Sequence, residues 1–287
     1  MSQISPEVEK KLSSAVERMP AFPKSVQKVL ELTRNINCLP KDLVGVIEKD
    51  PVMTVKILRL INSAAFAPPN KMTSINQSVV YLGLNTVKNM ALSFAAVGVL
   101  PRTNQAGFDV QKYLLHSLSV ASIARALAQK FAPGEADPGD CYIAGLLHDF
   151  GKVVFAQFMP DEFRAALEHC KTNAVPLHVA EAAVIGADHT VVGSMLAERW
   201  QFPKPLVECI RNHHRDAGQN AMGDCLRMAD QICRFRMYGD SGNPYREGEA
   251  PIAPQRFGSD LAAVIEKLGD IDKMIAEAHL FAQVEAE

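Results

Sequence analysis

The stretch from His148 to Lys152 reads HDFGK and places an imidazole and a carboxylate side by side at the end of an apolar run. Ala144 and Gly145 precede His148 by four and three residues, so small side chains share its face of a predicted helix and leave room for a close neighbour. A buried imidazole or carboxylate is costly without a partner, and one metal ion satisfies several of them at once. The stretch therefore predicts helices packed around a buried metal site.

Seven side chains of metal-ligand type fall on the core-facing sides of five predicted helices. His116, for example, leads Val120, Ile123 and Leu127 at i+4, i+7 and i+11, so it points with an apolar stripe. A single histidine in such a place is more often a core residue bonded to a backbone carbonyl. Five of the eight histidines and two carboxylates share the pattern, however, and we predict that they converge. The predicted metal ligands are His116, His148, Asp149, His189, His213, His214 and Asp230. The remaining histidines, interpreted as surface or packing residues, are His169, His178 and His279.

The donors of this set are nitrogen and oxygen with no thiolate, which suits a divalent iron, manganese, nickel, zinc or magnesium ion. Seven donors exceed a tetrahedral set, so one or two ions are expected, with Asp149 as a bridge between two. Such a site activates water and clamps a phosphate oxygen, which gives Asp149 a catalytic role. Lys152, just beyond the Gly151 turn, is predicted to place its ammonium on that phosphate. The alternative is a solvated lysine after a helix end.

Helical periodicity dominates the chain and no run alternates as a strand would, so the predicted fold class is all-α. The loop from Pro101 to Gly107 is interpreted as the seam between two helical lobes. The predicted domains are an N-terminal helical lobe, a metal-site lobe, and an excursion loop with a C-terminal amphipathic helix, at 1–103, 104–238 and 239–287. Helices of the second lobe are expected at about 110–131, 138–149, 159–173, 176–185, 189–200, 205–214 and 224–238. The excursion loop covers Gly239 to Gly258, and the last helix about Ser259 to Val284.

Composition narrows the class of protein. The 287 residues are 48% hydrophobic and 22% charged, as in an ordinary soluble globular protein. Apolar runs such as Met90 to Leu100 are too short to cross a bilayer, and Met1 to Lys10 is too polar for a signal peptide. None of the six cysteines forms a CxxC pair, which favours reduced core thiols. We therefore expect a cytoplasmic protein that does not bind membranes.

The order of the candidate ligands resembles a known superfamily. His116-Ser117, then HDFGK, His189, His213-His214 and Asp230 follow one another as in the HD superfamily of metal-dependent phosphohydrolases. The most similar catalytic branch is the HD-GYP cyclic dinucleotide phosphodiesterases. This chain departs from that branch after His214, where Arg215-Asp216-Ala217-Gly218 stands in place of a glutamate and a Gly-Tyr-Pro stretch. Cleavage of cyclic di-GMP in the HD-GYP manner is therefore not expected.

The first lobe carries a further set of motifs: Met19-Pro20 to Pro23, Lys49-Asp50-Pro51, Leu58 to Phe66, Ser74-Ile75 to Leu82-Gly83, and Val87 to Leu92. Through these motifs, residues from about 15 to 215 resemble the HDOD family of bacterial signalling proteins. The resemblance implies an all-α cytoplasmic protein in which a helical HDOD lobe packs on an HD-superfamily helical bundle. Many members of that family have lost HD metal ligands, whereas this chain keeps the whole set.

Two functions follow from these patterns. The first is a signal-transduction or regulatory protein with a retained divalent metal site, whose partner is a regulatory protein or a phosphorylated small molecule. The second is a metal-dependent phosphohydrolase or phosphodiesterase acting on a nucleotide or other phosphoester, with Arg211, Arg215 and Arg227 either as phosphate contacts or as surface charges. The C-terminal helix packs either on the body of the protein or on a second copy in a homodimer.

Nucleic-acid binding is the third class considered. Short helices around Gly83 invite comparison with a helix-turn-helix. Lys71, Lys88 and Arg102 are nevertheless too sparse to track a phosphate backbone, and the formal net charge of −2 offers no basic footprint. We therefore expect no nucleic-acid partner.

Overall fold

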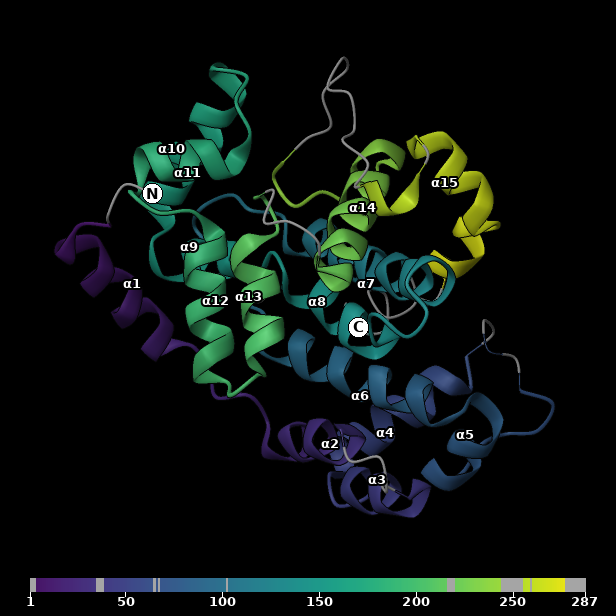
Figure 1. Ribbon diagram of the computed structural model, residues 1–287. Coiled ribbons are helices and arrows are strands. Elements are labelled where there is room, and N and C mark those ends of the chain that lie inside the picture. The colour runs from purple at the N-terminus through teal and green to yellow at the C-terminus, as the bar shows by residue number, and fades with distance from the viewer. Residues whose placement is uncertain are drawn as a thin grey trace. The chain divides into compact units, whose positions relative to one another are not determined.

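The computed structural model describes residues 4–34, 39–63, 66, 68–101, 103–215, 220–243, 255–258 and 260–276. Within these residues the regular elements are helices and no strand occurs, so the predicted all-α fold class is confirmed (Figure 1). The chain divides into two compact units. The small unit is built on Ala21–Val99, and the large unit on Met1–Pro20 with Leu100–Ile275. Each unit is described by itself.

The small unit is a cluster of short helices. They are α2 (Lys24–Arg34), α3 (Pro40–Ile47), α4 (Pro51–Ile61), α5 (Ile75–Leu82) and α6 (Leu84–Gly98). Asp50 begins α4, because its carboxylate accepts a hydrogen bond from the Met53 N–H at 3.1 Å. Gly83 separates α5 from α6 with a φ of +83°, a conformation that L side chains rarely adopt. Apolar side chains such as Ile57 and Val87 fill the interior.

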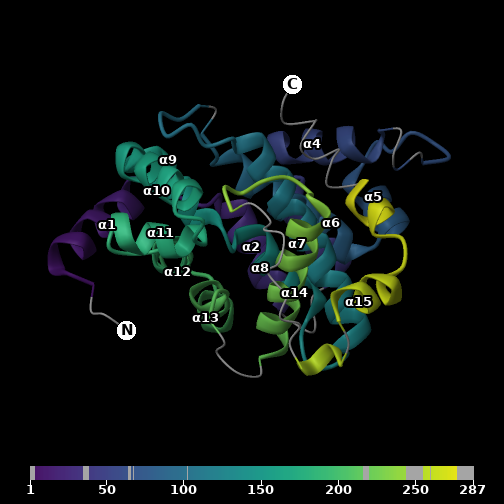
Figure 2. The same cartoon turned by 90° about the horizontal axis from the view of Figure 1, so that it is seen from above.

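The large unit holds most of the helices. They are α1 (Pro6–Arg18), α7 (Val110–Phe131), α8 (Pro138–Leu147), α9 (Phe150–Phe158), α10 (Pro160–Thr172), α11 (Leu177–Val184), α12 (His189–Arg199), α13 (Lys204–Asn212), α14 (Ala221–Arg236) and α15 (Leu261–Leu268), with a 3-10 turn at Gln255–Phe257. α7 packs along both α8 and α14, and α12 packs along α9 and α13. Viewed from above, α9 to α12 lie together in this unit (Figure 2).

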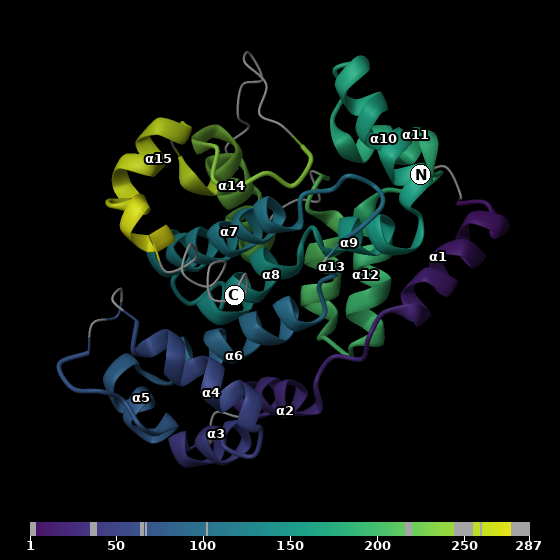
Figure 3. The ribbon, with the colours of Figure 1, turned by 180° about the vertical axis from the view of Figure 1, so that it is seen from behind.

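The first helix belongs to the large unit. α1 packs against α9 and α12 through Leu12, Ala15 and Val16, and it runs beside them in the view from behind (Figure 3). Its C-terminal end is tied down by Arg199, whose guanidinium donates to the carbonyl oxygens of Val16 at 2.8 Å and Met19 at 2.6 Å. The predicted first domain, 1–103, had placed this helix with the N-terminal lobe, so the compact units divide the chain differently from the predicted boundaries.

One predicted loop is a helix. The sequence pattern predicted that one helix ends at Asp149 and the next begins at Met159, but the structure has α9 at Phe150–Phe158. Residues 150–156 of α9 are all buried. A helix buried on every side has no polar face, so its sequence shows no amphipathic period.

The predicted C-terminal helix is interrupted. α15 ends at Leu268, and Gly269 follows with a φ of +87°, so the expected single helix from Ser259 to Val284 is wrong in its described part. The predicted excursion loop contains the 3-10 turn at Gln255–Phe257. Several positions on which predictions depended lie outside the described residues: Cys38, Arg102, 216–218, 244–254, Ser259, 277–284 and, among these, His279.

Two further sequence predictions have structural counterparts. The five cysteines that the structure describes are all buried, as predicted for core thiols. No single described helix is both long and apolar enough to cross a bilayer. α11 and α12 meet that criterion only when they are taken as one segment with an 87° bend.

Candidate metal centre

The structure brings all seven predicted ligands together inside the large unit. In two sets, one donor atom from each residue lies within 4.8 Å of the donors of the others. One set is His116, His148 and Asp149, and the other is Asp149, His189, His213 and His214. Asp230 joins the first set, since its Oδ1 lies 3.1 Å from Nε2 of His116. Asp149 is common to both sets.

Two of the histidines stand at the ends of helices. His148 follows α8 and His213 follows α13, each at the C-cap position. Their Nδ1 atoms lie 2.8 Å from the carbonyl oxygen of Gly145 and 2.7 Å from that of Ile210. A carbonyl oxygen only accepts, so each Nδ1 carries the proton and satisfies one of the last carbonyls of its helix. Each Nε2 is thereby directed into the site, where the neutral form of the ring offers its lone pair.

His189 is held in the same way by a carboxylate. It is the first residue of α12, and Glu181 of α11 accepts hydrogen bonds from its backbone N–H at 2.8 Å and from its Nδ1 at 2.5 Å. Its Nε2 then faces the cluster, 3.0 Å from Nε2 of His214 and 3.3 Å from Nε2 of His213. Two nitrogens that bind one metal at about 2.1 Å lie at about this separation. The sequence pattern missed Glu181, because an acidic residue eight positions before a histidine matches no ligand spacing.

Asp149 faces both sets of imidazoles with its two oxygens. It stands at the N-cap of α9, yet its side chain makes no capping hydrogen bond. Oδ1 lies 3.1 Å from Nε2 of His189 and 3.7 Å from Nε2 of His213. Oδ2 lies 3.3 Å from Nε2 of His148 and 3.9 Å from Nε2 of His116. The two oxygens of this one carboxylate thus face two different groups of imidazoles.

The charges of the site leave His213, His214 and Asp149 in the forms that bind a cation. Against the effect of burial, nearby carboxylates raise the pKa of His148 and of His189. Burial lowers the pKa of His213 to about 4 and that of His214 well below its ordinary value, so both rings are neutral at pH 7. Burial also opposes a charge on His189, but the Glu181 carboxylate outweighs it and raises that pKa to about 9. Burial raises the pKa of Asp149, but the charges of His148 and Lys152 outweigh it and hold that pKa well below its usual range. The carboxylate is therefore ionised at neutral pH.

Three buried atoms of the cluster lack a hydrogen-bond partner among the described residues. They are Nε2 of His116, Nε2 of His148 and Oδ1 of Asp149. Buried polar atoms are rarely left in this state, because each one costs its full desolvation free energy. Divalent cations that accept nitrogen and oxygen donors fit these residues, since they would partner all three atoms.

Close helix packing at two glycines brings the donors together. A Cβ at Gly145 would lie 2.5 Å from Cα of Ala121, so α8 approaches the α7 backbone closely near His148. A Cβ at Gly151 would lie 2.0 Å from the carbonyl oxygen of His189, so α9 meets the start of α12 backbone to backbone. The small residues before His148 were predicted to leave room for a close neighbour, and at Gly145 that neighbour is the backbone of Ala121.

Lys152 lies inside the site and not in solvent. Its side chain is 1% exposed, and its ammonium donates to Oδ2 of Asp149 at 2.7 Å and to Oγ of Ser241 at 3.1 Å. The alternative of a solvated lysine is therefore wrong, while its contact with a phosphate stays a prediction. Ser241, which the sequence pattern missed, arrives on the segment that follows α14. There a Cβ at Gly239 would lie 2.4 Å from the backbone nitrogen of His116.

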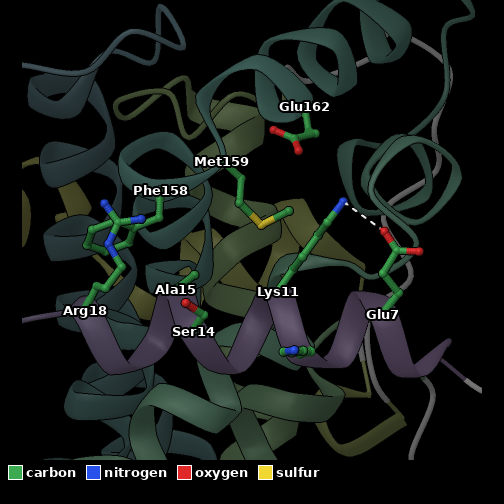
Figure 4. A pocket seen from close by; sticks show the side chains of 9 residues that line it. Glu7, Lys11, Ser14, Ala15, Arg18, Phe158, Met159 and Glu162 are labelled. Carbon is green, nitrogen blue, oxygen red and sulfur yellow. Dashed lines mark ion pairs between the residues drawn. The ribbon is translucent and has the colours of Figure 1, made fainter.

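A separate groove of about 430 Å³ lies between α1 and the junction of α9 with α10 (Figure 4). Its lining residues are Glu7, Lys10, Lys11, Ser14, Ala15, Arg18, Phe158, Met159 and Glu162, none of which belongs to the histidine–aspartate cluster. Lys11 pairs with Glu7 at 3.5 Å, and the Arg18 guanidinium lies 4.5 Å from the centre of the Phe158 ring. Two of its three basic side chains therefore already have partners on the protein.

The HDOD domain family matches residues 19–216, which is well over half of the chain. The chain belongs to the HDOD family. An uncharacterized protein of Treponema pallidum is 31% identical over 216 residues, which are 74% of this chain and 41% of that protein. This chain thus spans about two fifths of the length of that relative.

Solved structures share the HDOD fold. An HDOD domain protein of unknown function from Geobacter sulfurreducens is 26% identical with a TM-score of 0.78, over 94% of this chain and 98% of that one. A candidate signal transduction protein from Marinobacter aquaeolei is 23% identical with a TM-score of 0.80, over 100% and 68%. A candidate phosphohydrolase from Shewanella amazonensis is 24% identical with a TM-score of 0.73, over 96% and 97%. The last two show a common fold alone.

Proposed function

We propose that this HDOD protein is a regulatory protein of bacterial signal transduction whose large unit binds two divalent metal ions bridged by Asp149. One observation carries the proposal: the two oxygens of a single buried carboxylate face two different groups of histidines. Signalling is favoured over catalysis because the cluster is enclosed. Six of the seven donors are buried, and only His214 is partly accessible. The proposal places the protein in the cytoplasm, with a regulatory protein or a phosphorylated small molecule as its partner.

The two ions would have different ligands. His116, His148 and Asp230 would hold one ion together with Oδ2 of Asp149. The other would be held by Oδ1 of Asp149 and the imidazoles of His189, His213 and His214. Every predicted ligand has a place in one of these sets. Iron, manganese, nickel, zinc and magnesium remain the candidate metals.

A metal-dependent phosphohydrolase or phosphodiesterase, acting on a nucleotide or other phosphoester, is the second candidate function. When bound, a divalent ion supplies Lewis acidity toward a phosphoryl oxygen. The observation that favours this function is the Lys152 ammonium inside the cluster, 2.7 Å from Oδ2 of Asp149, where it would offer a positive charge to a phosphate. Two predicted phosphate contacts have other partners. Arg211 pairs with Glu198 at 2.9 Å, and Arg227 pairs with Asp224 at 2.6 Å.

Elemental analysis of the metal content tests the metal centre. The full chain is purified without chelator or metal-affinity resin, beside a His148→Ala/Asp149→Ala variant and a His169→Ala control on α10. We expect about two equivalents of metal in the wild type and the control, and loss from the double variant. A wild type that stays metal-free after reconstitution with iron, manganese or zinc would overturn the proposal.

A second assay separates the two functions. The metal-loaded wild type is offered a panel of nucleotides and a generic phosphodiester, beside a Lys152→Gln variant. Signalling without catalysis predicts firm metal binding and no turnover on any of these substrates. Turnover that requires metal and falls on removal of the Lys152 charge would instead establish the phosphohydrolase.

A further inference from the structure

Helix α11 supplies none of the seven donors, yet two of its side chains lie against two of them. Glu181 accepts both hydrogen bonds that His189 donates away from the cluster. His178 stacks on His214, with ring centres 4.3 Å apart and planes at 15°. The two residues are three positions apart, so they project from the same face of the helix. This face is therefore directed at the second group of histidines.

The burial of Glu181 needs an explanation. Its side chain is fully buried, and one of its oxygens, Oε1, has no hydrogen-bond partner among the described residues. Burying a carboxylate costs free energy unless its charge is paired and hydrogen-bonded. The partners it has both come from His189, through the backbone N–H and Nδ1. Two bonds to one residue fix the position of the ring as well as the backbone.

Capping of α12 does not account for this carboxylate. Asp188 already occupies the N-cap of α12, and its side chain accepts from the backbone N–H groups of Thr190 and Val191. The bond from Glu181 to Nδ1 of His189 contributes nothing to the helix end. Its effect is on the imidazole, because a carboxylate on Nδ1 directs Nε2 toward the site and makes that nitrogen a stronger donor.

We propose that α11 is the positioning helix of the metal centre: Glu181 orients His189 through Nδ1, and His178 holds the ring of His214 by stacking. The inference rests on the proposed metal binding and adds two residues that do not bind the metal themselves. His214 needs such support because it is the one donor of its set that is not fully buried. Packing against a parallel ring restricts its rotation without using either of its nitrogens.

The test measures metal affinity in the full chain by competition with a chromophoric chelator, using zinc. Glu181→Ala should weaken zinc binding by about 10- to 100-fold, the usual effect of removing a carboxylate behind a ligating histidine. Glu181→Gln keeps an acceptor oxygen and loses the charge, so its loss should be smaller. His178→Ala should weaken binding by about two- to tenfold, and His178→Phe, which keeps a ring, should restore most of it. The matched control is Glu198→Gln, a surface glutamate of α12 paired with Arg211.

A spectroscopic measurement separates positioning from a general loss of stability. The visible absorption spectrum of the cobalt-loaded protein should change in Glu181→Gln and stay unchanged in Glu198→Gln. If Glu181→Ala does not fold, Glu181→Gln decides the question. Folded variants with wild-type zinc affinity and an unchanged cobalt spectrum would overturn the positioning role. Failure of the metal centre itself would be visible in the wild type, whereas failure of this inference would be visible only in the variants.

Discussion

The small unit and the large unit bury different kinds of side chain. Among the described residues between Ala21 and Val99, the buried side chains are apolar apart from Ser78, Lys88, Asn89 and Ser93. The large unit buries seven ionisable side chains in one cluster of imidazoles, carboxylates and an ammonium group: His116, His148, Asp149, Lys152, His189, His213 and Asp230. An apolar interior is stable by itself, whereas a cluster of this kind is stable only when its charges and lone pairs are partnered. The large unit is thus the part of the chain whose stability depends on a ligand.

The two units also differ in the apolar side chains that they expose to solvent. In the part of the chain that the structure describes, nine large apolar side chains are highly exposed, and five of them lie in the small unit: Leu39, Val52, Val55, Val80 and Tyr81. Val52 and Val55 are three residues apart on α4, so they share one face. Because these side chains are already in water, substituting them changes little buried area. The contrast between the units can therefore be tested by matched substitutions.

Truncation of a core side chain should give the largest difference. Phe155 is 0% exposed in the large unit, whereas Val55 is 64% exposed in the small unit. Phe155→Ala should lower the free energy of unfolding by about 4 kcal/mol, and Val55→Ala should change it by less than about 0.5 kcal/mol. Urea denaturation followed by Trp200 fluorescence and by circular dichroism measures both. Similar losses in the two variants would contradict the contrast.

The same glycine-to-alanine change should have opposite effects in the two units. Gly151→Ala places a Cβ against the carbonyl of His189, so we expect a loss of about 3 kcal/mol together with weaker metal binding. Gly45 in α3 has nothing within 4 Å of the new Cβ, so Gly45→Ala should raise the free energy of unfolding by about 0.5 to 1 kcal/mol. Denaturation curves and zinc titrations of both variants give the comparison. A tolerated Gly151→Ala with normal metal affinity would show that α9 and α12 do not need this approach.

Metal addition should stabilise the large unit and leave the small unit unchanged. At a free concentration of about 100 times its Kd, a metal that binds only the folded protein raises the free energy of unfolding by about 2.7 kcal/mol. We expect the added protection against hydrogen exchange in α7, α8, α12, α13 and α14, with the amides of α2 to α5 unchanged. A chelator should reverse the effect. Equal protection in both units would remove the distinction between them.

The smallest expected effect on the free energy of unfolding concerns two aspartates at helix starts. Asp50 caps α4 and also accepts from the Ser25 hydroxyl at 2.8 Å, so Asp50→Ala should lower the free energy of unfolding by about 1 kcal/mol without affecting metal binding. Asp149 stands at the start of α9 without a capping bond, so Asp149→Asn should leave α9 intact and abolish metal binding. Denaturation and metal analysis of the two variants measure both effects. Metal loss in Asp50→Ala would contradict the assignment of helix capping to Asp50 and of metal binding to Asp149.

Sequence pattern predicted the parts of this molecule that depend on local chemistry. The helices expected at about 110–131 and 189–200 correspond to α7 and α12, and the histidines on apolar faces pointed to a shared interior. The sequence pattern did not identify residues that reach the cluster from distant parts of the chain. Glu181 and Ser241 reach the cluster from α11 and from the segment after α14, and no spacing along the chain connects them to it. His178, interpreted as a surface or packing residue, packs on a member of the cluster itself.

The close contact at Gly151 also bears on how related sequences are read. The adjacent histidine and aspartate of HDFGK are easily recognised, but they reach His189 only because the residue two positions after Asp149 has no side chain to separate α9 from α12. A related chain can keep the histidine–aspartate pair and yet carry a larger residue at this position. Such a chain would lack the backbone contact between α9 and α12 that brings the donors together. The glycine is therefore a criterion for sorting HDOD sequences into those that can build a metal centre of this geometry and those that cannot.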